Sequence, residues 1–238
     1  MAVSKCALVS LLLAFALAGA AQTTAYADSG SLINLSTIIF DGDLNGMQSS
    51  QTFAGMAGTV AHVSVTLNIS GGINGDLYAS LLHGGTGAVL LNRVGRSGTS
   101  GAGYADAGFG LDASLNSFTL DDQASHDVHL YRTFSYLLNG SGQLTGQWQP
   151  DGRALDPLSA GSAFDSAARS NPLSVFNGAD PNGLWTLFVA DVSPLGESTL
   201  VSWGLTVAVP EPGSVPLILV GLAGGMVWAR ARRRIGAD

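Results

Sequence analysis

The chain has 238 residues, of which 46% are hydrophobic and 11% are charged, and its formal net charge is −7. Between Asp28 and Val209 stand 15 acidic residues against 5 arginines, a net charge of −10. Such an acidic region argues against nucleic acid as a partner, because neutralising phosphates requires clustered Lys and Arg. Part of the apolar content lies in two terminal segments, which leaves roughly one domain's worth of chain between them.

The first 27 residues have the layout of a secretory signal peptide. A short start carries Lys5, an apolar run covers residues 6–21, and small residues occupy the cleavage positions Ala25 and Ala27. This arrangement predicts export with cleavage after Ala27, and an uncleaved membrane anchor is the alternative. The one cysteine, Cys6, falls inside this segment, so neither a disulfide framework nor thiolate chemistry is expected in the exported part.

Strand patterns dominate the region that follows. Residues 32–40 are apolar and rich in β-branched side chains. In residues 63–69 apolar and polar side chains alternate, which predicts a strand with one buried and one solvated face. Glycine-rich turns then separate two further predicted strands, 75–82 and 89–94.

The middle of the chain has fewer periodic patterns. Residues 96–110 are glycine-rich and predict a long surface loop. A strand is expected to carry Val128, Leu130 and Phe134. Residues 140–171 are polar and turn-rich, and we expect them to be almost entirely loop.

Two more strand-like runs, 184–190 and 199–207, flank a turn-rich segment and predict a β-hairpin with Trp185 and Trp203 as core anchors. No long 3.6-residue apolar period occurs between Asp28 and Val209, so helices should be few and short. Short strands joined by glycine-rich turns predict an all-β fold, an antiparallel sandwich or jelly roll.

Beyond Val209 the composition changes abruptly. The tripeptide Pro210, Glu211 and Pro212 precedes an apolar run, residues 215–229. As a helix this run would be ~22 Å long, short of the ~30 Å hydrocarbon core, so it predicts a marginal membrane segment. The basic end of the chain, which should stay on the cytoplasmic side, consists of Arg230, Arg232, Arg233 and Arg234.

This tail resembles the PEP-CTERM sorting signal of Gram-negative bacteria, since the tripeptide, the short apolar helix and the basic end follow one another in that order. The resemblance implies an exosortase as partner, transient anchoring in the membrane, and export to the cell surface or extracellular matrix. A simple C-terminal anchor is the alternative. The expected organisation is a signal peptide (1–27), a β-sandwich (28–209, core 40–207) and a sorting and membrane segment (210–238).

A second set of motifs runs through residues 40–207. In order, they are 63–69 with Gly75-Asp76-Leu77, 118–124, Gly146 with Pro150-Asp151-Gly152, 176–191, and Trp203-Gly204-Leu205. This order is similar to the P domain, also called Homo B, of subtilisin-like proprotein convertases. The chain departs from it at Ser70-Gly71-Gly72, where the family often has a His-containing segment. The resemblance implies a jelly-roll β-sandwich. In convertases the domain stabilises a neighbouring protease, a role that here would have to act in trans.

Calcium is a candidate cofactor. Asp41, Asp43 and Asn45 match the first half of a calcium loop, but Thr52 stands where a bidentate Glu belongs, which favours an acidic turn. The P-domain resemblance places further oxygen donors at strand ends. Their alternative role, which we favour, is to cap turns. These donors are Asp76, Asp121, Asp122 and Asp191.

No catalytic motif stands out, and enzyme activity is not expected. A G-x-S-x-G elbow, an H-E-x-x-H pair and a phosphate-binding glycine loop with Lys do not occur. His126 and His129 would point to opposite faces of a strand, so we expect two solvated or loop histidines rather than a metal pair. Four tyrosines are candidates for a sugar-stacking platform, with core packing as the alternative. They are Tyr78, Tyr104, Tyr131 and Tyr136.

The leading hypothesis is an exported, non-enzymatic protein of the cell surface or extracellular matrix, with a structural or adhesive role. One alternative is a module that binds polysaccharide or calcium-dependent partners. Another is an accessory P domain that assists a secreted subtilisin-like protease in trans.

Overall fold

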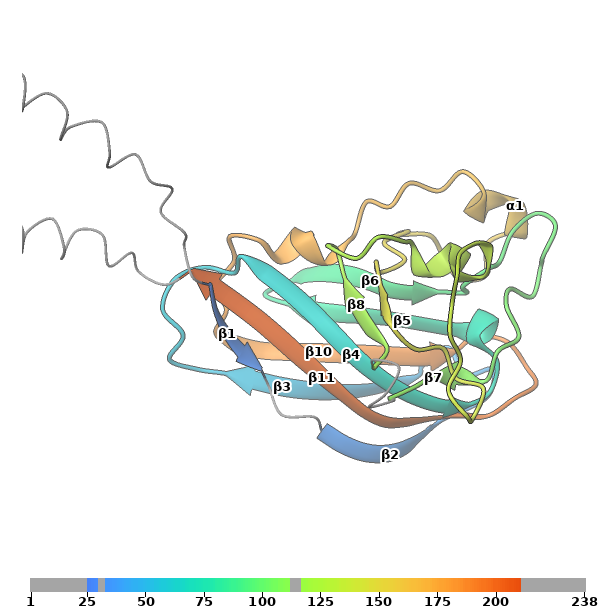
Figure 1. Ribbon diagram of the computed structural model, residues 1–238, viewed down its shortest axis with the longest axis horizontal. Helices are drawn as coiled ribbons and strands as arrows, with labels where there is room; N and C mark the ends of the chain where they lie inside the picture. Colours follow the sequence, from blue (N-terminus) through green and yellow to red (C-terminus); the bar gives the residue numbers. More distant parts are fainter. Residues whose placement is uncertain (1–24, 30–32, 112–116, 211–238) are drawn as a thin grey trace, which may run out of the picture. The chain divides into compact units, whose positions relative to one another are not determined.

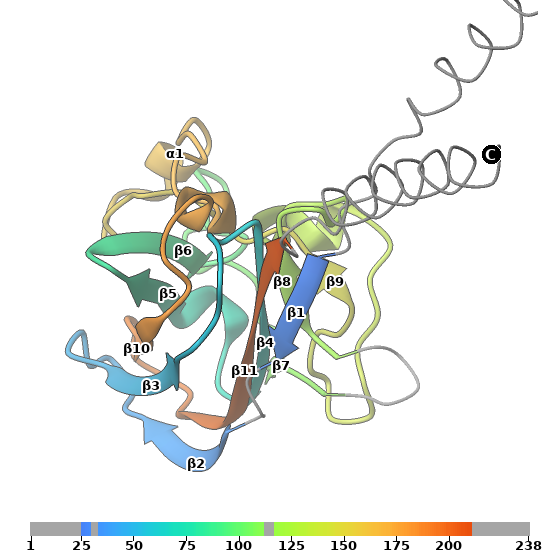
Figure 2. The same cartoon turned by 90° about the vertical axis from the view of Figure 1, so that its left-hand side faces the viewer.

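The computed structural model describes residues 25–29, 33–111 and 117–210, which belong to one compact unit, Ala25–Pro210. Two β-sheets face each other across a shared core, as Figures 1 and 2 show. Helical structure in these residues is limited to short turns. The predicted all-β sandwich is therefore confirmed.

The larger sheet, sheet A, has the order β1-β11-β4-β8-β9, with β2 paired to β11 and β7 paired to β4. Its pairs are antiparallel except for β8 and β9, which run parallel. The strands are β1 (Ala25–Ser29), β2 (Ile33–Ile39), β4 (His62–Gly71), β7 (Gly108–Phe109), β8 (Thr119–Asp121), β9 (Gln147–Trp148) and β11 (Ser198–Pro210).

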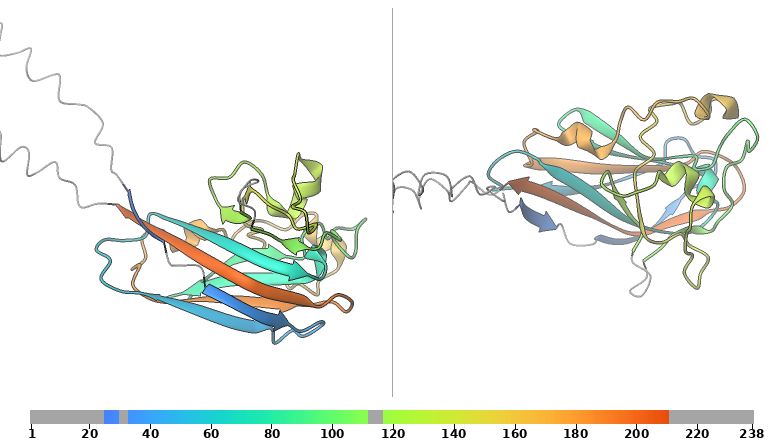
Figure 3. Two further views of the ribbon diagram at one scale, coloured as in Figure 1. Left: turned by 60° about the horizontal axis from the view of Figure 1, so that its bottom comes forward. Right: turned by 45° about the horizontal axis from the view of Figure 1, so that its top comes forward.

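The smaller sheet, sheet B, is entirely antiparallel and has the order β3-β10-β5-β6. Its strands are β3 (Met47–Phe53), β5 (Leu77–His83), β6 (Thr86–Asn92) and β10 (Gly183–Asp191). Among the short helices, η2, η3 and α1 lie on the side of the sandwich away from β2 and β3 (Figures 1 and 3). The helices are η1 (Asn74–Asp76), η2 (Val128–Thr133), α1 (Gly161–Phe164) and η3 (Leu173–Phe176).

The strand predicted from alternation at residues 63–69 is β4, at the centre of sheet A. Its side chains alternate between buried and half-buried positions along almost its whole length. The apolar members Val65, Leu67 and Ile69 are completely buried against sheet B. The period of two residues in an extended chain places every second side chain on the same face, which is why this pattern predicted the strand correctly.

The predicted hairpin of 184–190 and 199–207 is wrong, although both runs are strands. β10 pairs with β3 and β5 in sheet B, whereas β11 pairs with β1, β2 and β4 in sheet A. The segment between them crosses from one sheet to the other. As a result Trp185 and Trp203, both fully buried, enter the core from different sheets.

The strand predicted through Val128, Leu130 and Phe134 is also wrong, because this segment forms the 3-10 helix η2. The Asp127 carboxylate accepts a hydrogen bond from the backbone N–H of His129 at 2.9 Å and caps the helix. Val128 and Tyr131, three residues apart, are both buried, which fits three residues per turn. β3 was not predicted, because its polar side chains suit a sheet edge with one solvated face.

The predicted terminal segments lie largely outside the described residues, so the signal peptide and the sorting tail stay predictions. Ala25 and Ala27 fall within β1, whose backbone pairs with the last residues of β11, and the predicted cleavage would divide this strand. Pro210 is the last residue of β11. In the described part of the chain, no helix has the length and apolar character needed to cross a membrane.

Candidate ligand-binding site

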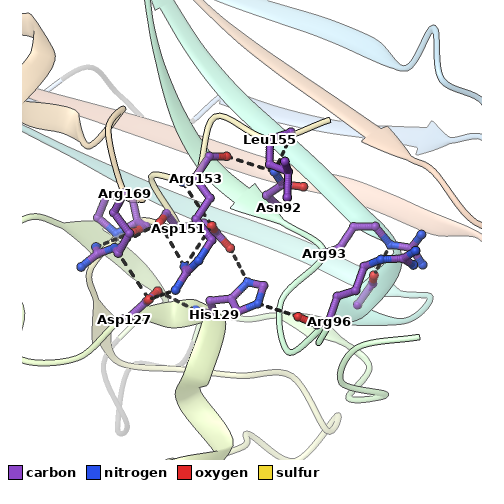
Figure 4. Close-up of polar contacts among 11 residues, drawn as sticks. Asn92, Arg93, Arg96, Asp127, His129, Asp151, Arg153, Leu155 and Arg169 are labelled. Atoms are coloured by element: carbon purple, nitrogen blue, oxygen red, sulfur yellow. Dashed lines mark hydrogen bonds and ion pairs between the residues drawn. The ribbon is translucent and has the colours of Figure 1, made fainter. Parts of the chain in front are cut away.

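A buried ionic network underlies the loops on the η2 side of the sandwich (Figure 4). His129, only 3% exposed, places Nδ1 at 2.7 Å from the Asp151 carboxylate and Nε2 at 3.0 Å from the Arg96 carbonyl oxygen. The Arg96 carbonyl oxygen can only accept hydrogen bonds. The Asp151 carboxylate, which also accepts a hydrogen bond from Arg153, is an acceptor as well. Both ring nitrogens thus lie within hydrogen-bond distance of an oxygen, and the His129 ring is held between Asp151 and the Arg96 carbonyl.

Arg153 links this pair to the start of η2. Its guanidinium donates to Asp127 at 2.9 Å and to Asp151 at 3.2 Å. Burial acts to lower the pKa of Arg153, but the charges of Asp151 and Asp127 and the hydrogen bonds to them outweigh burial and raise it. Arg169 adds bonds to Gln149 and to the carbonyl oxygens of Pro150 and Asp151. The network therefore joins four separate loops.

The predicted pair of solvated histidines is correct for His126 and wrong for His129. His126 is exposed and stacks on Phe134, with ring centroids 3.9 Å apart. His129 turns inward because η2 is helical and because Asp151 lies beneath it. No local sequence signal marks this pair, since the two residues are 22 positions apart.

One pocket next to this network has a volume of about 410 Å³, and we call it the Arg96 pocket. Arg96 donates to the carbonyl oxygens of Gly101 and Ser159, and its guanidinium carbon lies 5.7 Å from the Phe164 ring centroid. Hydroxyl, aromatic and cationic side chains line the pocket. Its lining residues are Gly95, Arg96, Ser97, Thr99, Ser100, Tyr104, His129, Leu130, Thr133, Arg153, Phe164 and Asp165.

A second pocket, of about 370 Å³, is lined by residues before and after η2, and we call it the Trp148 pocket. Its lining contains no Asp, Glu, Lys or Arg. Trp148 forms part of the wall and donates its indole N–H to the Thr145 carbonyl oxygen at 2.9 Å. The lining residues are Gln123, Ala124, Ser125, His126, Ser135, Tyr136, Leu137, Thr145, Gly146, Gln147 and Trp148.

Three of the four candidate tyrosines come together between the two pockets. Tyr131 is fully buried and packs edge to face against Tyr104, at 4.8 Å, and against Tyr136, at 5.4 Å. Burial raises the pKa of the Tyr131 phenol, and its hydrogen bond to Asp106 raises it further. Tyr78 lies apart, on β5, and packs against Phe188. Tyr131 is thus a core residue, and Tyr136 is the tyrosine exposed in the Trp148 pocket.

The candidate calcium ligands do not form one cluster. Asp121 pairs with Ser64 near the start of β4, whereas Asp76 belongs to η1, which follows the end of β4. Asp121 accepts from His62 and Gln123, and Asp122 accepts from the first backbone N–H groups of η3. Both therefore have the capping role that was the favoured alternative.

The 41–46 loop also has a capping pattern. The Asp43 carboxylate accepts from the backbone and side-chain nitrogens of Asn45 at 2.9 and 2.8 Å. The Asp41 carboxylate accepts from the backbone N–H of Leu195 at 2.9 Å. Thr52, at the twelfth position of the candidate loop, lies within β3. The loop is an acidic turn held by its own hydrogen bonds.

Asp191 is the least compensated carboxylate of the candidate set. It is fully buried, and one of its oxygens has no hydrogen-bond partner among the described residues. Burial raises its pKa to about 7, and the nearby charges of Asp76 and Asp41 add to the rise. Asp76 is held by Arg93 at 3.2 Å. Within the described ranges no three His, Cys, Asp or Glu side chains are arranged to hold a metal ion.

Comparison with known proteins gives only distant likenesses. No protein-family model and no curated protein matches the chain. A crystal structure of an Aeromonas sobria serine protease in complex with a chaperone aligns at 17% identity with a TM-score of 0.40, over 78% of this chain and 27% of that chain. The Aeromonas sobria serine protease in a second crystal structure aligns at 15% identity with a TM-score of 0.39, over 77% and 27%. The chain thus spans about a quarter of the length of the matched protein.

Proposed function

We propose that this protein is an exported, non-enzymatic β-sandwich of the cell surface or extracellular matrix, and that it acts in adhesion by binding polysaccharide in the Trp148 pocket. The observation that carries the proposal is the lining of this pocket. Aromatic side chains stand there beside amide and hydroxyl groups, without a carboxylate, lysine or arginine.

This combination suits an uncharged sugar. The C–H face of a pyranose ring packs on an aromatic face, and Tyr136, 36% exposed, presents such a face. Gln123, Ser135 and Gln147 supply donors and acceptors for ring hydroxyls. The volume of about 370 Å³ lies within the range of small-ligand sites.

The cellular location is proposed from the two ends of the chain. A signal peptide ending at Ala27 would direct export, and the tail from Pro210 would be anchored and then processed by an exosortase. Cell fractionation checks this part, and recovery of the protein mainly in the cytoplasm would refute it. Removal of residues 210–238 is expected to shift the protein from the membrane or cell surface to the medium.

Glycan-array binding tests the proposed ligand class. We expect binding to neutral polysaccharide that calcium does not change, because the Trp148 pocket contains no carboxylate. Tyr136→Ala and Gln147→Ala should weaken binding at least tenfold. Phe40→Ala, which removes an aromatic side chain that is 63% exposed and lies outside the pocket, should bind like the wild type. No glycan binding by the folded wild-type protein would contradict the proposal.

The role of an accessory P domain for a secreted protease stays a prediction of the family resemblance. Co-purification with a subtilisin-like protease would favour it over adhesion.

A further inference from the structure

We propose that the Arg96 pocket is a second binding site, separate from the Trp148 pocket, and that it takes a carboxylate-bearing sugar of the uronic acid class. Arg96 is the residue that would receive the carboxylate. The proposal does not depend on neutral-sugar binding in the Trp148 pocket, because the two linings share no residue.

The first argument is charge. Among the described residues, four arginines each have a carboxylate within 4.0 Å, whereas Arg96 has none. Arg96 meets two carbonyl oxygens, at 2.7 and 2.9 Å, which orient the guanidinium but do not neutralise it. A cation without a counter-ion at the wall of a pocket attracts an anionic group, and a guanidinium matches the geometry of a carboxylate. The four paired arginines are Arg93, Arg132, Arg153 and Arg169.

The second argument is hydrogen bonding. Arg96 and Arg153 both line the pocket, and each has a buried Nε–H without an acceptor in the described part of the chain. Arg153 as a whole is only 8% exposed. A buried donor without a partner is unfavourable, so an acceptor group brought by a ligand would be stabilised here.

The rest of the lining favours a ligand with hydroxyl groups over a simple anion. Ser97 and Thr99 contribute hydroxyl groups 3.2 Å apart, and Ser100 and Thr133 contribute two more. Asp165 is exposed and accepts from the Gly98 backbone N–H at 3.1 Å. Its negative charge would repel a bare anion, but its oxygens can accept from sugar hydroxyls. A uronic acid supplies hydroxyl groups for Asp165 as well as a carboxylate for Arg96.

The pocket wall is also held in place. The Arg96 carbonyl oxygen accepts from the buried His129 ring at 3.0 Å, which ties the 96–100 loop to the ionic network. Gly161 lets α1 approach this loop closely, because a Cβ there would lie 2.2 Å from the Ser97 carbonyl oxygen. Phe164, at the end of α1, stacks on His129 with ring centroids 5.7 Å apart. A site with such fixed walls needs little ordering when it binds a ligand.

Isothermal titration calorimetry on the full chain tests the proposal with glucuronate and galacturonate oligosaccharides, the matching neutral oligosaccharides, and acetate. We expect the uronates to bind at least tenfold more tightly than the neutral sugars or acetate, with affinity falling as salt rises. Arg96→Gln should lower uronate affinity at least tenfold. Arg132→Gln makes the same change in net charge outside the lining and should retain affinity within twofold.

Thr133→Trp is the second variant, because it fills the pocket from an exposed position and keeps Arg96 and the ionic network. It should abolish uronate binding while its melting temperature stays close to that of the wild type. Tyr136→Ala should leave uronate binding unchanged, which separates this site from the neutral-sugar site. Uronate affinity that is unchanged in Thr133→Trp, or equal affinity for uronate, neutral sugar and acetate, would overturn the proposal.

Discussion

Trp203 on β11 of sheet A donates its indole N–H to the hydroxyl of Ser49 on β3 of sheet B, with the two atoms 2.8 Å apart. Trp203 is fully buried. This bond therefore joins the two layers, from the edge strand β3 of sheet B to β11 of sheet A, in addition to the apolar packing between them.

Ser49→Ala should destabilise the protein by about 1–3 kcal/mol, because the buried indole N–H would lose its acceptor. Urea denaturation of wild type and variant measures this difference. Ser50→Ala is the matched control, since the Ser50 hydroxyl is exposed and forms a hydrogen bond with the Thr186 hydroxyl at 2.9 Å. The control should change stability by less than about 0.5 kcal/mol. Equal stability of Ser49→Ala and wild type would contradict the role of this bond.

Asp191 should make stability fall as the pH rises from about 4 to 7. Its pKa in the folded state is about 7, against an ordinary value of 3.8, so the folded state keeps a proton that the unfolded state releases. The contribution is complete below the unfolded pKa and is lost as the pH passes through the folded pKa. Asp191→Asn, which does not titrate, should gain on the order of 4 kcal/mol relative to wild type between pH 4 and pH 8.

Urea unfolding at a series of pH values checks this expectation. Asp180→Asn serves as the control, because hydrogen bonds from Asn182 lower the pKa of Asp180. The contribution of Asp180 is present above its unfolded pKa and is lost as the pH falls, so this variant should keep the slope between pH 4 and 7. If the stability of wild type and of Asp191→Asn changed in parallel with pH, Asp191 would be ionised in the folded state at pH 5.

His129→Ala should cost about 1–3 kcal/mol, because the buried Asp151 carboxylate loses a hydrogen-bond partner. The melting temperature or urea midpoint reports the loss. His126→Ala is the natural control, three residues away and exposed, and it removes only the stacking contact with Phe134. Similar small effects of the two substitutions would contradict a stabilising role for the buried contact between His129 and Asp151.

Calcium should not stabilise the protein. Asp76 is held by Arg93, Asp41 by the Leu195 backbone N–H, and Asp43 by Asn45. Thermal unfolding with 5 mM calcium, with 5 mM magnesium and with a chelator is expected to give the same melting temperature. A rise that is specific to calcium and is absent in Asp191→Asn would contradict this expectation and support a calcium site at Asp41, Asp76 and Asp191.

Whether a run of residues forms a strand or a turn could be predicted from the sequence where one physical cause decides it. Alternation in residues 63–69 reflects one buried face, and it identified β4 correctly. β3 escaped detection because an edge strand with polar side chains resembles a loop in sequence. The acidic turn at Asp43 and the cap formed by Asp122 follow from short-range hydrogen bonds that carboxylates make in any loop.

By itself the sequence determined the all-β class, the central strand, the two tryptophan anchors and the capping role of several aspartates, because these depend on burial patterns and local bonding. Tertiary structure alone decided that β10 and β11 belong to different sheets, since strand pairing depends on which edges other strands already occupy. It also decided which groups the His129 and Arg96 side chains contact. The pairing of His129 with Asp151, and the absence of a described carboxylate within 4.0 Å of Arg96, follow from contacts between distant loops, which no local pattern records.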